Sequence, residues 1–205
     1  GITDSIETTA CHVYTTALAT ADYLRRQVKD RPMTAFVIGE SGLQDALKNV
    51  GFRLVRGAEE RPTYTVVGLD RNVTYEKFVQ AVLAIQHGSQ FIGTNLDTNI
   101  PNQRGMLPGA GAVVDFVRYA TGQTPVTIGK PAKIIMDEVL NRIQLPREQV
   151  LMIGDNLNTD IMAAKNADMD SLLTLTGLTK QAPLATDKII PTHVVNNLTE
   201  WRLSE

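Results

Sequence analysis

Cysteine and histidine are scarce in this chain. The 205 residues contain one cysteine, Cys11, and three scattered histidines, His12, His87 and His193. One thiol cannot form an internal disulfide, and these positions do not match the clustered ligands of a zinc site. We therefore expect neither a disulfide framework nor structural zinc, and we interpret Cys11 as an inert thiol that is packed or partly exposed.

The chain also lacks long apolar runs and an excess of positive charge. No apolar run approaches the length of a membrane span, and the N-terminus has no basic region followed by an apolar core. The formal net charge is −2, which disfavours electrostatic binding to nucleic acid. The hydrophobic content of 43% supports a sizeable core, in one ordinary domain or two small ones. We expect a soluble, cytoplasmic protein with no membrane or nucleic-acid partner.

The most informative segment is Gly-Asp-Asn-Leu-Asn-Thr-Asp at residues 154–160, directly after the apolar run at residues 150–153. Such a run is typical of a buried parallel strand, and open α/β sheets bind ligands beyond the carboxyl ends of their strands. Asp155 would lie at that edge, and Asp160 would lie at the start of the next helix. Two carboxylates that converge there suit Mg²⁺, which takes few protein carboxylates. The alternative is that Asp160 or Thr159 caps the helix and Asp155 belongs to a turn.

Lys130 ends a second strand-like run. Residues 126–129 are followed by Lys130 and Pro131, and then by a helical pattern of apolar residues between 134 and 143. Lys130 would therefore also lie at a strand exit, where its ammonium group could bind phosphate and help hold a neighbouring carboxylate ionised. Taken alone, such a lysine is more often a solvated loop residue.

Strand-like and helical patterns alternate along the chain, which predicts an α/β fold. The first part of the chain contains two similar strand-helix-strand units. The expected strands are residues 35–38, 52–55, 64–67, 91–92, 126–129, 150–153 and 171–176, and the expected helices are residues 17–28, 42–50, 75–86, 109–120, 134–143 and 160–165.

The order of these elements and motifs resembles the haloacid dehalogenase (HAD) superfamily of phosphatases. In this resemblance Lys130 is the third motif, and Asp155 and Asp160 form the fourth. Further segments look like the NagD or 4-nitrophenylphosphatase branch, and the match runs along nearly the whole chain: residues 14–24, 37–40, 66–70, 91–97 and 108–111. The resemblance implies an α/β fold with a HAD-like Rossmannoid three-layer core and an inserted α/β cap domain of the C2 type.

One part of the family pattern is missing from these residues. Members start with a strand that ends in Asp-x-Asp-Gly, whose first Asp attacks phosphorus and whose second acts as acid and base, and a Ser/Thr-Asn motif follows. Neither motif is present, and the Asp-x-Asp at residues 168–170 precedes the strand at residues 171–176, so we expect it at the opposite sheet edge. Because Gly1 matches a position inside the relatives, we expect a fragment that lacks its nucleophile and an incomplete core.

The resemblance also implies a domain organisation. We assign residues 31–122 to the cap and residues 1–30 and 123–205 to the core, because a cap of this type is inserted before the lysine motif. Both boundaries between core and cap fall in segments that contain Pro or Gly, as is typical of linkers. A single continuous sheet is the alternative.

The polar loop at residues 93–105 follows a strand exit and is too long for a tight turn. In the resembling family this loop reaches over the core and shapes the leaving-group pocket, with the positions of Leu69 and Ile100 facing substrate. Asn95 and Asp97 are further substrate-binding candidates. The alternative, which we favour for Asn95, is that these side chains only hold the loop through bonds to the backbone.

The leading hypothesis is a Mg²⁺-dependent phosphatase of small phosphate monoesters, of the 4-nitrophenyl phosphate, sugar phosphate or nucleotide monophosphate type. An Asp upstream of this chain would form an aspartyl-phosphate, which water then hydrolyses. Asp155 would ligate Mg²⁺, and Asp160 would complete the metal site or orient Asp155 or a ligand water. Lys130 would screen the charge of phosphate and nucleophile, and Asn156 would contact substrate.

Two alternatives are left open. The chain could be a noncatalytic fragment that binds phosphate ligands or a partner, or an unrelated α/β protein that binds sugar phosphates. In the leading hypothesis the partner is a small phosphate ester, and a homodimer is left open.

Overall fold

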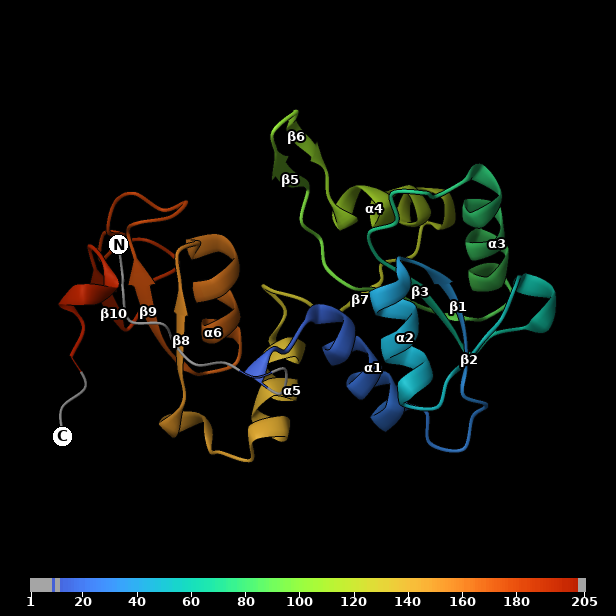
Figure 1. The fold of residues 1–205 in the computed structure, drawn as a ribbon, viewed down its shortest axis with the longest axis horizontal. Coiled ribbons are helices and arrows are strands. Elements are labelled where there is room, and N and C mark those ends of the chain that lie inside the picture. Colours follow the sequence, from blue (N-terminus) through green and yellow to red (C-terminus); the bar gives the residue numbers. More distant parts are fainter. Residues whose placement is uncertain (1–8, 10–11, 203–205) are drawn as a thin grey trace.

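The structure is a computed structural model that describes residue 9 and residues 12–202. Within these residues helices are interspersed with strands along the chain, and the strands form three sheets (Figure 1). The helices are α1 (Thr16–Gln27), α2 (Ser41–Asn49), α3 (Tyr75–Gln86), α4 (Ala110–Thr121), α5 (Lys133–Ile143) and α6 (Met162–Asn166). The strands are β1 (Thr34–Ile38), β2 (Arg53–Leu54), β3 (Tyr64–Val67), β4 (Gln90–Gly93), β5 (Asn99–Asn102), β6 (Gly105–Pro108), β7 (Val126–Thr127), β8 (Leu151–Gly154), β9 (Asp170–Thr174) and β10 (His193–Val195). A π-helical turn at Leu157–Ile161 precedes α6.

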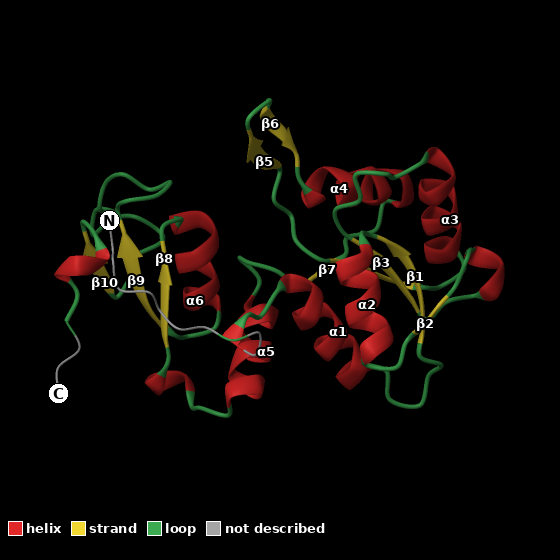
Figure 2. Cartoon of the chain, in the orientation of Figure 1, coloured by secondary structure: helices red, strands yellow, loops and turns green. Residues whose placement is uncertain are grey.

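A five-stranded parallel sheet forms the larger half, in the strand order β2-β1-β3-β4-β7. Its central strands are almost fully buried, as parallel strands between two helical layers are. On one face, Leu24 of α1 and Leu47 of α2 belong to one core cluster. On the other face, Ile85 of α3 and Val117 of α4 pack with Ile38 of β1. Figure 2 shows these helices on the two sides of the sheet.

The chain leaves the two central strands of this sheet in opposite directions. β1 leads through α2 to β2 on one side, and β3 leads through α3 to β4 on the other. This topology confirms the two expected strand-helix-strand units. It also creates a switch point at the carboxyl ends of β1 and β3, where open α/β sheets form ligand crevices. Glu40, Asp70 and Arg71 line such a crevice.

A smaller parallel sheet contains three strands in the order β10-β9-β8. The middle strand β9 is buried from Ser171 to Thr174. In contrast, β8 pairs only with β9 among the described residues, and the side chain of Ile153 is 46% exposed. One edge of β8 therefore presents backbone groups that no described strand covers.

Helix α1 lies between the two halves of the molecule. It begins after Thr15, whose hydroxyl accepts a hydrogen bond from the backbone N–H of Leu18, and it packs against both α2 and α5. Its Arg26 forms an ion pair with the buried Glu138 of α5. The division into residues 31–122 and the remainder stays a prediction, although α1 and β7 both associate with the five-stranded sheet across its proposed limits.

Two sequence-based expectations need correction, and one alternative is excluded. The alternative of a single continuous sheet is wrong, because the described strands form separate sheets. The polar loop at residues 93–105 contains the antiparallel β5-β6 hairpin, whose turn includes Gly105 at φ 122°. Strand β10 was not expected, because it is short and two of its three residues are exposed. The Asp-x-Asp at residues 168–170 lies at the start of β9, whose first residue is Asp170, and so at the sheet edge opposite to Asp155, as expected.

No helix in the described part of the chain is long and apolar enough to cross a membrane.

We predict that backbone amides of β8 exchange with solvent faster than those of β3 in the isolated chain. Strand β3 is paired on both sides, by β1 and β4, whereas β8 is paired on one side only. Hydrogen exchange read by mass spectrometry on peptides from the two strands measures the difference. Equal, strong protection of both strands would contradict the unpaired edge, and the same experiment at several protein concentrations would reveal pairing between copies.

Candidate active site

A cavity of about 550 Å³ lies where the exits of β4, β7 and β8 approach one another. It brings together six of the predicted site residues, which come from three separate segments of the sequence: Asn95, Asp97, Lys130, Asp155, Asn156 and Asp160. Seven residues that were not predicted as site residues complete the lining: Thr16, Leu96, Thr98, Asn99, Met106, Thr159 and Leu178.

Asp160 is the centre of the polar contacts in this cavity. Its Oδ1 accepts a hydrogen bond from Lys130 Nζ at 2.6 Å, and its side chain is only 9% exposed. Its Oδ2 accepts hydrogen bonds from the backbone N–H groups of Asp155 and Asn156, both at 3.2 Å. Because both carboxylate oxygens are engaged, Asp160 fixes the position of Lys130 and shapes the turn that follows β8.

Asp155 has one carboxylate oxygen engaged and one available. Its Oδ2 accepts a hydrogen bond from the backbone N–H of Leu178 at 2.8 Å, and its carbonyl accepts one from Thr179 at 2.9 Å. The Oδ1 atom makes no hydrogen bond within the described part of the chain. Asp155 therefore presents a free carboxylate oxygen at the carboxyl end of β8.

Two glycines allow these backbone segments to come so close. A Cβ atom added at Gly154 would overlap the side chain of Asp160, and one added at Gly177 would overlap the carboxylate of Asp155. Glycine at both positions lets the turn after β8 and the loop after β9 enclose the two carboxylates.

The residues present fit a Mg²⁺ ion with few protein ligands. Mg²⁺ prefers oxygen ligands and usually keeps several waters, with one or two carboxylates and phosphate oxygens as the others. Within the described residues no group of three or more His, Cys, Asp or Glu side chains could hold a metal. Asp155 offers the free oxygen, whereas the engaged oxygens of Asp160 suit a positioning residue. The metal roles of both residues stay predictions.

The loop after β4 is held over the cavity by the start of α4. Asn95 Oδ1 accepts a hydrogen bond from the backbone N–H of Asp97 at 3.2 Å, which matches the alternative in which Asn95 holds the loop. The backbone N–H of Gly111 donates to the carbonyl of Asp97 at 2.9 Å, and that of Gly109 donates to the carbonyl of Thr98 at 2.8 Å. These contacts place the loop beside Lys130.

Comparison with known proteins gives the family. A model described as HAD-hydrolase-like matches residues 127–201. The 5'-nucleotidase YutF of Bacillus subtilis is 43% identical over 196 residues, which are 96% of this chain and 75% of that protein. An acid sugar phosphatase of Staphylococcus saprophyticus is 42% identical over 191 residues, which are 93% of this chain and 72% of that protein.

Solved structures agree with these relatives. A mutant of the thermostable p-nitrophenylphosphatase from Bacillus stearothermophilus superposes with a TM-score of 0.87 at 38% identity, covering 96% of this chain and 75% of that one. NagD from Escherichia coli K-12 superposes with a TM-score of 0.87 at 29% identity, covering 97% of this chain and 76% of that one. The chain belongs to the NagD-like branch of the HAD family of phosphatases. The expected family and the HAD-like α/β fold are thus confirmed.

The structure separates two residues from the rest of the predicted site of this HAD phosphatase. The β5-β6 hairpin directs Asn99 and Met106 to the cavity that contains Lys130. Leu69 and Ile100 instead line a second cavity of about 590 Å³, on the other side of the hairpin. The resemblance that assigned them to the leaving group is not tested by this placement, and their substrate role stays a prediction.

Some residues that line this HAD site carried a signal that sequence reasoning did not use. Leu178 follows β9, the parallel neighbour of β8, so its loop had to meet the loop of Asp155 at the same sheet edge. Thr16 begins α1, and its position depends on how that helix packs between α2 and α5. No local pattern indicates such a placement.

We predict that Gly154→Ala destabilises the chain by about 1–3 kcal/mol, the usual cost of forcing extra volume into a packed site. The added methyl group would push the Asp160 side chain away from its backbone partners. Urea unfolding followed by circular dichroism measures the change. Gly42→Ala is the matched control, because Gly42 lies in α2 with no atom within 4 Å of an added Cβ. Equal unfolding midpoints for Gly154→Ala and the unmodified chain would contradict the close approach.

Proposed function

We propose that this chain carries the lysine and acidic motifs of a Mg²⁺-dependent phosphatase of small phosphate monoesters. The observation that carries the proposal is the Lys130–Asp160 pair beside the free oxygen of Asp155, at the carboxyl end of β8. Its relatives are named as phosphatases and a 5'-nucleotidase, which supports phosphate-ester hydrolysis as the reaction class.

Each of the three residues has a separate task in this proposal. The ammonium group of Lys130 stabilises negative charge on the phosphoryl oxygens and on the attacking carboxylate. Asp155 holds the metal through its free oxygen, and a bound Mg²⁺ would supply a Lewis acid for phosphate. Asp160 orients Lys130 and the turn that contains Asp155 and is therefore a positioning residue.

The attacking group is an aspartate that the residues of this chain do not provide. In the family this aspartate follows a strand, attacks phosphorus and displaces the ester oxygen, and water then hydrolyses the aspartyl-phosphate. The edge of β8 that no described strand covers supports the proposal, because a parallel strand added there would end beside Asp155 and Lys130. Such a strand would also cover Ile153, which is 46% exposed.

The proposed substrates are small monoesters of the 4-nitrophenyl phosphate, sugar phosphate or nucleotide monophosphate type. The cavity of about 550 Å³ has the size of a small-molecule site. Asn95, Asp97 and Asn156 line it beside Lys130 and are the proposed substrate contacts. The proposed contact of Leu69 and Ile100 with the leaving group rests on the family resemblance alone.

We predict that the chain of 205 residues does not hydrolyse 4-nitrophenyl phosphate above a blank without metal. Lys130 has no carboxylate, and in the proposal the free oxygen of Asp155 holds the metal, so neither residue supplies the attacking group. Adding a segment with a strand followed by Asp-x-Asp-Gly, encoded in frame before Gly1, is expected to produce turnover that depends on Mg²⁺. Nitrophenol release is read by absorbance. Robust turnover by the 205-residue chain would contradict the proposed source of the nucleophile.

In the extended protein we predict different effects for the two acidic residues. Asp155→Asn should weaken Mg²⁺ binding and activity by about 10- to 100-fold or more, because it neutralises the proposed ligand. Asp160→Asn should lower the maximal rate with a smaller change in the Mg²⁺ concentration for half activity. Asp168→Asn is the control, since Asp168 lies outside the cavity with an 84% exposed side chain. Unchanged Mg²⁺ dependence in Asp155→Asn would move the metal site elsewhere.

A further inference from the structure

A second cavity lies on the opposite side of the β5-β6 hairpin from the candidate active site. It has a volume of about 590 Å³ and extends from the exit of β3 to the start of α4. The hairpin pairs Ile100 with Leu107 and Pro101 with Met106. Because neighbouring residues of a strand point to opposite faces, Leu107 lines this second cavity while Met106 lines the cavity of Lys130.

The walls of the second cavity are mostly apolar. Leu69 and Val73 come from the segment after β3, and Val113 comes from α4. Ile100 and Leu107 face them from the hairpin, and Ile100 is 37% exposed. A preformed cavity of this size, with apolar walls and few polar groups, is typical of a small-molecule site rather than of a protein interface.

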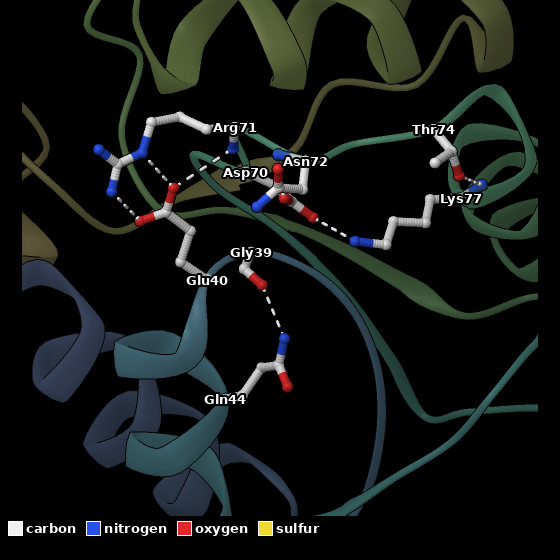
Figure 3. A network of polar contacts seen from close by, with 8 residues as sticks. All are labelled: Gly39, Glu40, Gln44, Asp70, Arg71, Asn72, Thr74 and Lys77. Carbon is white, nitrogen blue, oxygen red and sulfur yellow. Dashed lines mark hydrogen bonds and ion pairs between the residues drawn. The ribbon is translucent and has the colours of Figure 1, made fainter.

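The charged residues of the cavity leave one positive charge without a partner. In Figure 3, Arg71 donates two side-chain hydrogen bonds to Glu40, at 2.6 and 2.8 Å. These hydrogen bonds lower the pKa of Glu40 to about 2, so the pair stays ionised across the neutral range. Asp70 is buried and accepts a hydrogen bond from Lys77 Nζ at 2.6 Å. Arg104 also lines the cavity, and its guanidinium forms no ion pair within the described residues.

The geometry points to a binding site for a compact apolar carboxylic acid, with its carboxylate on Arg104 and its apolar body between the hairpin and α4. Arg71 and Asp70 already form ion pairs with Glu40 and Lys77, so the charge left for a ligand is the single positive charge of Arg104. A ligand with one negative charge matches it. The apolar walls select an aromatic or branched body over a sugar. Lys130, Asp155 and Asp160 line the other cavity, so binding of this acid does not depend on their proposed roles, and Leu69 and Ile100 are the residues that both proposals use.

Isothermal titration calorimetry of the 205-residue chain with 2-naphthoate tests the proposal. Saturable binding at one site is expected, with weaker binding of 2-naphthamide, which lacks the charge, and of acetate, which lacks the apolar body. Arg104→Gln should weaken 2-naphthoate binding by about tenfold or more and leave the affinity for 2-naphthamide unchanged. Arg25→Gln, which removes an exposed charge from α1, is the matched control and should bind 2-naphthoate normally.

A second pair of variants tests which side of the hairpin is used. Leu107→Trp should fill the cavity and abolish 2-naphthoate binding, whereas Met106→Trp places the same side chain on the opposite face and should preserve it. Lys130→Gln should also bind normally. The proposal is overturned by an absence of saturable 2-naphthoate binding, by equal affinity of Arg104→Gln and the unmodified chain, or by weakened binding in Lys130→Gln, which would put the ligand in the other cavity.

Discussion

The buried carboxylate of Asp160 is the contact on which the candidate active site depends. One of its oxygens binds the ammonium group of Lys130, which follows β7, and the other binds backbone N–H groups directly after β8. Because β7 belongs to the five-stranded sheet and β8 to the three-stranded sheet, a single side chain connects the exits of both sheets. The positions of Asp155, Asn156 and the cavity wall all follow from this connection.

The packing around Asp160 explains why the local sequence has little freedom. The carboxylate can reach two backbone amides only because Gly154 has no side chain to occupy the same space. Asp155 is in turn held by the loop after β9, through the backbone N–H of Leu178. The two carboxylates therefore differ in what remains available to a ligand. Both oxygens of Asp160 accept hydrogen bonds and orient its neighbours, whereas Asp155 retains one oxygen without a hydrogen bond among the described residues.

Sequence reasoning succeeded where local patterns and sheet geometry decide the outcome. The helix at Tyr75–Gln86 was expected with the same limits, because its apolar face is periodic, and the structure adds that Thr74 caps its first turn. Lys130, Asp155 and Asp160 were expected to meet because Lys130 and Asp155 each follow a strand and Asp160 was expected to begin the next helix, and the cavity brings them together. The family and its HAD-like fold could be inferred from the same motifs.

Sequence reasoning failed for strands whose residues are all exposed, and for side chains whose face depends on the pairing register of the strand. All four residues of β5 are exposed, so no alternation of buried and exposed residues indicates a strand there. The side of the hairpin that Ile100 occupies depends on its pairing with Leu107, which only the folded structure defines. The placement of Thr16 depends on helix packing, which is not a local property.

The hairpin forms a wall that two cavities share, with Met106 on one side and Leu107 on the other. A displacement of this wall that widens one cavity narrows the other, since the two strands move as one paired unit. A ligand that displaced this wall would therefore link the occupancy of the two cavities thermodynamically. A ligand that shifts the hairpin from one side changes the affinity on the opposite side, and the coupling free energy is the same in both directions.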